Sequence, residues 1–186
     1  MPPKVKITKQ EIIEAALKIV REQGDIALNA RSIANMLCCS TQPIFSNFVN
    51  MEQLRFEIIN RAERVYEQYV KQETQSGDYP EYKAMGIAYI RFAKEEKNLF
   101  KLLFMRDRTN EEAVDDTRLT RQAYDVVQKN TGVNSDIARL FHLEMWSYTH
   151  GIAAMLATGY LDLDFELISK MLTDFYTALK RQYEKE

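Results

Sequence analysis

Residues 29–54 read NARSIANMLCCSTQPIFSNFVNMEQL, and this stretch decides how the chain folds. The apolar residues Ile33, Ala34 and Leu37 recur at helical spacing, which predicts a short helix with one inner face. Asn29 is a good N-cap for this helix, because its side-chain oxygen can accept a hydrogen bond from a backbone N–H that lacks a partner inside the helix. The stretch therefore begins with a helix whose start and buried side both follow from its sequence.

A second short helix is predicted at about residues 41–48, after a tight turn that contains the two cysteines. Ser40 can cap this helix, and Pro43 falls in its first turn, where the missing N–H costs nothing. Ile44 and Phe48 point inward, and the outward residues are small or uncharged: Thr41, Gln42, Ser46 and Asn47. Such side chains can approach base edges in a DNA major groove without like-charge repulsion, so we interpret the two helices as a helix-turn-helix.

Two longer helices flank this pair. Upstream, Thr8 and Glu11 can form a capping box for a helix that ends at Gly24, which is expected to be a left-handed C-cap. Downstream, Asn50 can cap a helix that continues to about residue 75, with Gln53 at the return position of another capping box. This last helix is longer than a small DNA-binding domain needs, and it is expected to link that domain to a second one.

The remainder of the chain is also predicted to be helical. Only four prolines and six glycines are present, and no segment alternates apolar and polar residues over the length of a strand. Further helices are expected at about residues 81–95, 98–105, 117–130, 135–160 and 164–183, with an exposed charged connector at 106–116. The last two helices carry extra apolar faces. These faces indicate a four-helix dimer interface built from two copies. The alternative is that both helices bury these faces inside the monomer.

The charge distribution gives little guidance. The formal net charge is −2, and the first 60 residues carry seven Lys and Arg against six Asp and Glu, so charge alone does not predict nucleic-acid binding. The first ten residues contain Lys4 and Lys6 and lack the apolar segment of a signal peptide. We expect residues 1–7, together with Lys9, to be a solvated tail or an arm that reaches DNA phosphates or the minor groove.

Two other features concern the compartment. Cys38 and Cys39 are adjacent, so they cannot staple distant segments, and they are either buried or half-buried thiols in a turn or a redox sensor. Two cysteines that do not staple the fold fit a reducing, cytoplasmic location. Residues 145–161 contain no Asp, Glu, Lys or Arg, but they are short for a membrane span and include polar residues. A buried core helix is expected there.

Enzyme chemistry is not indicated. The chain has no phosphate-binding glycine loop and no nucleophile elbow, so we expect neither an enzyme nor a bound cofactor. His142 and Glu144 project from nearly opposite sides of a helix, and His142 and His150 lie more than two turns apart. No metal site is therefore expected, and His150 is interpreted as a core or pocket histidine.

The N-terminal part of the chain resembles the DNA-binding domain of TetR-family transcriptional regulators. The resemblance covers residues 8–54 and is carried by Ile12, Ala15, Ala16, Gly24, Arg31-Ser32-Ile33-Ala34, residues 40–48 and Met51-Glu52-Gln53-Leu54. Trp146-x-x-x-His150-Gly151 resembles the signature of the WHG-type C-terminal domains of that family. Its spacing places Trp146 and His150 on one helix face, and Gly151 would permit a close helix approach.

The resemblance implies an all-α fold of about nine helices in two domains. Residues 1–52 would form a three-helix helix-turn-helix DNA-binding domain, and a long helix from about residue 51 would lead out of it. Residues 53–186 would form a helical domain for effector binding and dimerisation. The implied partners are a double-stranded DNA operator, a small-molecule effector and a second copy of the chain held through the two C-terminal helices, with no membrane.

The same resemblance supplies candidate site residues. Those toward DNA are Arg31, Ser32, Ser40, Thr41, Gln42, Pro43, Phe45, Ser46 and Asn47. Phe45 stands where the family usually has Tyr, and Met51 where it usually has Lys, so one hydroxyl and one positive charge toward phosphates are missing. Those toward an effector are Tyr66, Tyr89, Phe92, Phe104, Met145, Trp146 and His150, although the same side chains could simply fill a core.

The sequence leaves two functional hypotheses. The first is a transcriptional regulator, expected to be a repressor that a small apolar or aromatic effector releases from DNA. The alternative is a dimeric helical interaction protein whose helix-turn-helix no longer binds DNA.

Overall fold

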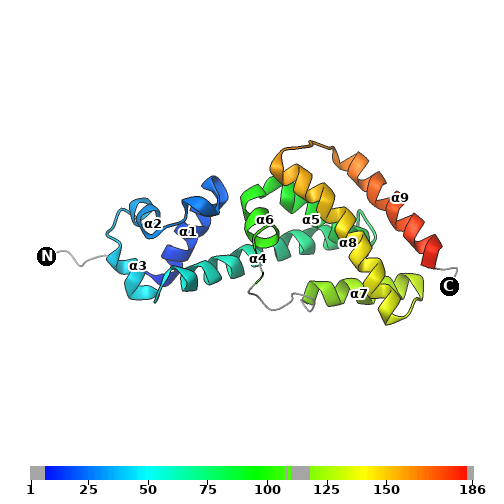
Figure 1. Ribbon diagram of the computed structural model, residues 1–186, viewed down its shortest axis with the longest axis horizontal. Coiled ribbons are helices and arrows are strands. Elements are labelled where there is room, and N and C mark those ends of the chain that lie inside the picture. Colours follow the sequence, from blue (N-terminus) through cyan, green and yellow to red (C-terminus); the bar gives the residue numbers. More distant parts are fainter. Residues whose placement is uncertain (1–6, 108, 110–117, 184–186) are drawn as a thin grey trace. The chain divides into compact units, whose positions relative to one another are not determined.

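The computed structural model describes residues 7–107, 109 and 118–183. Within these ranges the chain forms nine α-helices, one short 3-10 helix and no strand, which confirms the predicted all-α fold (Figure 1). In chain order the elements are α1 (Lys9–Gln23), η1 (Asp25–Ala27), α2 (Ala30–Met36), α3 (Gln42–Asn47), α4 (Met51–Ser76), α5 (Glu81–Glu95), α6 (Lys97–Phe104), α7 (Arg118–Thr131), α8 (Ser135–Thr158) and α9 (Phe165–Tyr183). Lys4 and Lys6 of the expected arm, and most of the connector at 106–116, lie outside the described residues.

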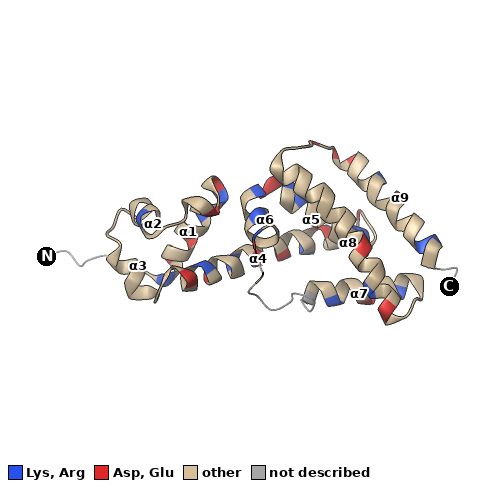
Figure 2. Cartoon of the chain, in the orientation of Figure 1, with Lys and Arg blue, Asp and Glu red and all other residues tan. Residues whose placement is uncertain are grey.

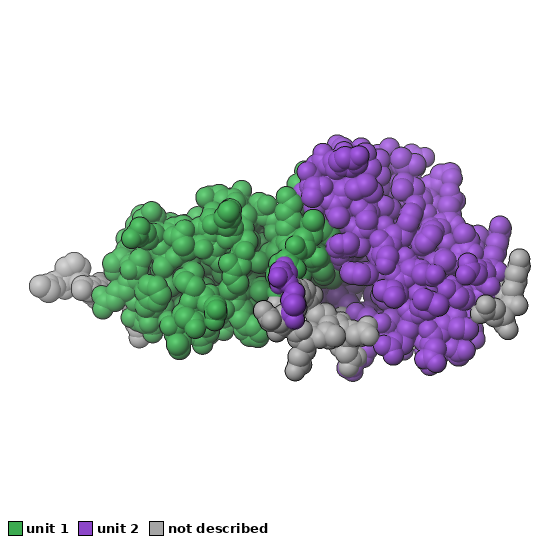
Figure 3. Space-filling view, viewed as in Figure 1, with its two compact units in different colours: residues 1–66, 96–106 green, residues 67–95, 107–186 purple. Residues whose placement is uncertain are grey.

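The chain divides into two compact units (Figure 3). Unit 1 comprises residues 1–66 and 96–106, and unit 2 comprises residues 67–95 and 107–186. Helix α4 begins in unit 1 and ends in unit 2, and α6 belongs to unit 1 although it follows α5 in sequence. The functional boundary after residue 52 remains a prediction, because these units are defined by packing rather than by function.

Helix α1 packs against η1, α2, α3 and α6 within unit 1. Its predicted capping box is present: the N–H of Glu11 donates to Thr8 Oγ1 (3.2 Å), and the N–H of Thr8 donates to Glu11 Oε2 (2.8 Å). Gly24 follows with φ 82° and ψ 168°. The predicted left-handed helical cap is therefore wrong, although this backbone region is one that essentially only glycine adopts. The side-chain amide of Asn98 donates to the carbonyl of Arg21 (3.0 Å) and so attaches α6 to α1.

In unit 2, α5 packs against α7, α8 and α9. The close approach occurs at Gly86 of α5, where an added Cβ would lie 3.5 Å from Cδ1 of Leu172 on α9. At Gly151, by contrast, an added Cβ would meet nothing within 4 Å. The close approach expected at Gly151 is therefore not made within the described part of the chain.

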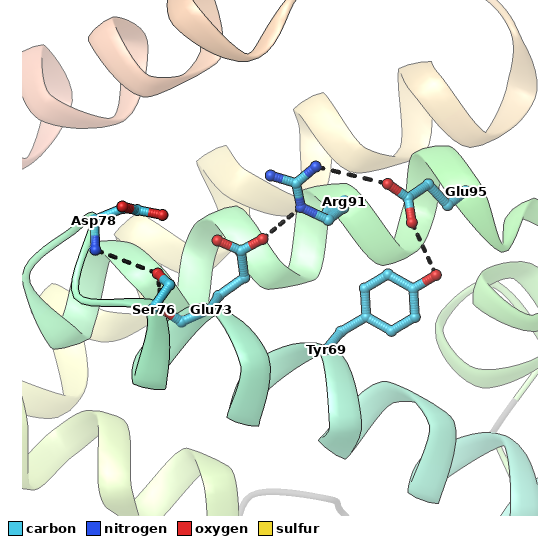
Figure 4. Close-up of polar contacts among 6 residues, drawn as sticks. All are labelled: Tyr69, Glu73, Ser76, Asp78, Arg91 and Glu95. Carbon is cyan, nitrogen blue, oxygen red and sulfur yellow. Dashed lines mark hydrogen bonds and ion pairs between the residues drawn. The ribbon is translucent and has the colours of Figure 1, made fainter.

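The C-terminal end of α4 is held to α5 by charged groups within unit 2 (Figure 4). The hydroxyl of Tyr69 donates to Glu95 Oε2 at 3.0 Å, and Arg91 pairs with both Glu73 and Glu95, the latter at 3.6 Å. The guanidinium of Arg91 also lies over the ring of Phe165 on α9, 4.2 Å from its centroid. Arg91 therefore connects the end of α4 to two helices of unit 2.

His142 on α8 lies in a cluster of aromatic side chains in unit 2. Its Nδ1 is 2.9 Å from the hydroxyl of Tyr82 on α5, and the ring of Tyr124 on α7 meets it edge to face at 5.2 Å. Burial lowers the pKa of His142 to about 4. The fold therefore keeps this imidazole neutral at ordinary pH, inside a cluster of aromatic side chains.

This shift predicts that mild acid destabilises the protein. Because the unfolded chain protonates His142 near its ordinary pKa of 6.5 and the folded chain only near 4, the contribution of His142 is complete above pH 6.5 and is lost as the pH falls toward 4. By pH 5 the free energy of unfolding should have fallen by about 2 kcal/mol from this residue. Urea titrations at pH 7.5 and pH 5 measure the loss, which should be smaller in His142→Gln. An equal loss in that variant would show that another group is responsible.

Candidate functional site

Helix α2 begins with the predicted cap. Oδ1 of Asn29 accepts from the backbone N–H groups of Arg31 and Ser32, both at 3.0 Å, and Oγ of Ser32 accepts from the N–H of Asn29 at 3.1 Å. The Ser32 hydroxyl also lies 2.9 Å from the carbonyl oxygen of Ala27, so the fold already uses it in this cap. Arg31 is exposed and forms no ion pair with any other described residue. Of the two candidates at this helix start, Arg31 is thus the more available for a phosphate.

The turn between α2 and α3 contains both cysteines. Cys38 is exposed, so the expectation of a buried or half-buried thiol is wrong at this residue. Its φ of 51° is a left-handed conformation that is uncommon for a residue with a side chain. The N–H of Cys39 donates to the carbonyl of Ala34 at 2.9 Å, which closes the end of α2. Both thiols are free. This turn sets the angle at which α3 leaves α2.

Helix α3 begins at Gln42, one residue later than predicted. Its N-cap position is Thr41 rather than Ser40, and no side chain forms a capping hydrogen bond there. Pro43 lies in the first turn, as predicted. Ile44 and Phe48 are buried, which confirms the predicted inner face.

The outward side of α3 carries Gln42, Phe45 and Ser46, all exposed, and no charged residue (Figure 2). The Ser46 hydroxyl donates to the carbonyl of Gln42 at 2.9 Å, and the Asn47 side-chain amide donates to the carbonyl of Pro43 at 2.8 Å. Thr41, Pro43 and Asn47 are half-buried. Five of the predicted contacts, Gln42, Pro43, Phe45, Ser46 and Asn47, therefore lie on α3, and they differ in how exposed they are.

Residues 48–50 connect α3 to the start of α4. Asn50 caps it, since its Oδ1 accepts from the N–H of Gln53 at 2.8 Å. The return bond differs from the prediction, because Oε1 of Gln53 accepts from the N–H of Val49 rather than from that of Asn50. Val49, directly after α3, is exposed and was absent from the predicted contacts. The only feature of the sequence that could have indicated the exposure of Val49 is its position between the buried Phe48 and the capping residue Asn50.

The predicted effector residues are divided between the two units. Tyr66 and Phe104 belong to unit 1, where their rings meet edge to face with centroids 5.4 Å apart. Burial raises the pKa of Tyr66. The other five belong to unit 2.

Within unit 2, Tyr89, Phe92 and Met145 are buried, whereas Trp146 is 42% exposed. Trp146 stacks on His150, with ring centroids 5.2 Å apart, as expected for residues one helical turn apart. The hydroxyl of Tyr89 lies 2.8 Å from His150 Nδ1, and burial lowers the pKa of His150. The exposed indole, the imidazole and the phenol thus form a continuous aromatic and polar group on α5 and α8.

Among the residues that the structure describes, no group of three or more His, Cys, Asp or Glu side chains is placed to hold a metal ion. In the same residues, no helix has the length and apolar character needed to span a bilayer. Residues 145–161 lie mainly in α8, which presents a buried side to its own unit.

Comparison with known families identifies the class of protein. The family model described as "Tetracyclin repressor-like, C-terminal domain" matches residues 82–175, which run from α5 into α9. No curated protein matches the chain. The chain belongs to the tetracycline repressor-like (TetR) family of regulators.

Proposed function

We propose that this regulator is a DNA-binding repressor that leaves its operator when a small apolar or aromatic effector binds. The observation that carries the proposal is the outward side of α3, which exposes Gln42, Phe45 and Ser46 while Ile44 and Phe48 hold the helix to its unit. A short uncharged helix of this kind fits a major groove, as the second helix of a helix-turn-helix does. The proposal places the protein in the cytoplasm with its DNA.

Each candidate contact has a proposed role. Thr41, Gln42, Ser46 and Asn47 face base edges, and Gln42 is suited to pair with an adenine through two hydrogen bonds. Ser46 and Asn47 would exchange their bonds to α3 carbonyls for bonds to DNA. Arg31, Ser32 and Ser40 hold phosphates, as do the first N–H groups of α4. Pro43 and Phe45 supply apolar contact.

The exposed side of α8 supports a homodimer. Leu140 and Leu143 are 47% and 55% exposed, and Leu167 on α9 is also exposed. The open space at Gly151 would admit a helix of the second copy. Two such helix pairs form a four-helix interface. A dimer then presents two α3 helices to half-sites about one turn of DNA apart, or slightly more.

The effector is proposed to act through α4. This helix contributes to both compact units, and Arg91 connects its C-terminal end to α5 and α9. The aromatic residues around Trp146 and His150 suit a ligand with a flat apolar body and one or two polar groups. Such a ligand releases DNA only if it binds more tightly to the α4 position that mismatches the operator.

The experiment that tests this function is selection of bound duplexes from random DNA by the full-length protein. We expect enrichment of one partly palindromic sequence, and we expect a panel of aromatic compounds to contain some that weaken binding to it. Recovery of no enriched sequence at low salt would contradict the DNA-binding function. Enrichment without any responsive compound would contradict only the effector.

The second candidate is a dimeric interaction protein. The weak net positive charge of the first 60 residues and the replacement of the usual Tyr and Lys at Phe45 and Met51 favour it. This candidate predicts a dimer in sedimentation that shows no salt-dependent retention of DNA.

The position of Met51 gives a direct test of docking. It is the first residue of α4, where the family usually supplies a lysine. Met51→Lys should tighten DNA binding regardless of sequence and steepen the plot of log affinity against log salt by about 0.9 per half-site, because one more phosphate is neutralised. Fluorescence titrations at several salt concentrations measure the slope. Lys placed instead at exposed Gln75, near the end of α4, should leave the slope unchanged, and an unchanged slope in Met51→Lys would argue against this docking.

A further inference from the structure

Phe45 presents an apolar ring on the side of α3 that carries the polar contacts. It is 54% exposed, and its ring makes no aromatic or cation contact with the described part of the chain. Gln42, three residues earlier, is also exposed. Side chains three residues apart on a helix are neighbours, with Cβ atoms about 5–6 Å apart. The ring and the amide therefore reach out side by side.

We infer that Phe45 reads the 5-methyl group of a thymine beside the adenine contacted by Gln42, so that each half-site requires thymine at one defined position. This inference rests on the proposed function and adds to it a feature of the operator. In the major groove, thymine presents a methyl group and cytosine does not. An exposed ring gains free energy when it covers such a group, because both surfaces leave water.

The surroundings of Phe45 favour a base over a phosphate. Phe45 has no hydroxyl, so it cannot donate to a phosphate oxygen as a tyrosine could. The donors of Ser46 and Asn47 are directed to carbonyls of their own helix. The exposed groups least engaged by α3 itself are therefore an amide and a ring. When the amide of Gln42 pairs with adenine and the ring of Phe45 covers a methyl group beside it, the two side chains together specify a base step that contains thymine.

The experiment replaces thymine by uracil, which removes only the methyl group. The operator enriched from random DNA is remade with deoxyuridine at one thymine position at a time, in both half-sites together, and affinity is measured by fluorescence anisotropy. At one position the affinity of the wild-type protein should fall by about fourfold per half-site, or about 15-fold in all, the value expected for one buried methyl group. Phe45→Ala should bind the thymine and uracil duplexes equally.

Phe56→Ala is the matched control. Phe56 lies on α4, is 64% exposed and belongs to the same unit, but it is outside α3. Its removal should leave the thymine preference of the wild type intact. A selected operator at which no uracil changes the affinity, or a preference that persists in Phe45→Ala, overturns this inference alone. Failure of the selection overturns the inference together with the proposed function.

Discussion

Leu143→Asp is expected to split the proposed dimer into monomers and to weaken operator binding by about a thousandfold, since binding of the second half-site is then no longer intramolecular. Leu143 is 55% exposed in the single chain, so a carboxylate there costs the monomer little. In a dimer the same carboxylate would be buried against α8 and α9 of the second copy without a partner. The substitution therefore acts on association rather than on folding.

Sedimentation velocity and anisotropy titration together measure the effect. We expect Leu143→Asp to sediment as a monomer, to keep its helical circular dichroism and to retain weak, salt-dependent binding to DNA. Ile26→Asp is the matched control, because Ile26 is 96% exposed on η1, away from α8 and α9 in the sequence. It should remain a dimer. A dimeric Leu143→Asp protein would contradict the proposed interface.

Phe92→Ala is expected to lower the free energy of unfolding by about 3–5 kcal/mol, the usual range for a large aromatic side chain removed from a packed interior. Phe92 on α5 is fully buried, and its ring meets that of Tyr69 on α4 with centroids 5.5 Å apart. The lost contacts leave a cavity that the surrounding helices fill only in part. The midpoint of thermal unfolding should fall by about 10 °C or more.

A milder pair of variants separates packing from ligand binding at this position. Phe92→Leu and Phe141→Leu both shorten fully buried phenylalanines of unit 2, but Phe141 is not a candidate effector contact. Each should cost about 1.5 kcal/mol or less. If Phe92 touches the effector, only Phe92→Leu should also shift the effector concentration needed to release DNA. Equal shifts of that concentration in the two variants would assign Phe92 to the core alone.

For Phe92→Ala, a loss of unfolding free energy below about 1 kcal/mol would contradict the packing itself.

The helix starts were predictable because their causes are local. Thr8 with Glu11, Asn29 with Ser32, and Asn50 with Gln53 each form their capping bonds within a few residues. The inner faces of α1 and α3 were predictable for a similar reason, since helical periodicity alone sets which residues share a side. The details that failed, at Gly24, Ser40 and Gln53, concern backbone angles or a shift of one residue.

The long-range contacts were not predictable. Tyr82 meets His142 and Tyr89 meets His150 across about 60 residues of sequence. Gly86, rather than Gly151, lies at the close helix approach. Each of these contacts depends on which helices pack together and at what rotation, and periodicity within one helix carries no such information.

By itself, the sequence determined an all-helical chain, the order of its helices and a helix-turn-helix whose uncharged second helix faces outward, because caps and apolar periodicity act over one or two turns. Only the tertiary structure decided that α6 joins α1 in unit 1, that Arg91 ties α4 to α5 and α9, and that the candidate effector residues fall in both units. Those arrangements arise from the mutual packing of surfaces far apart in the chain, where many combinations of helices could bury a similar apolar area.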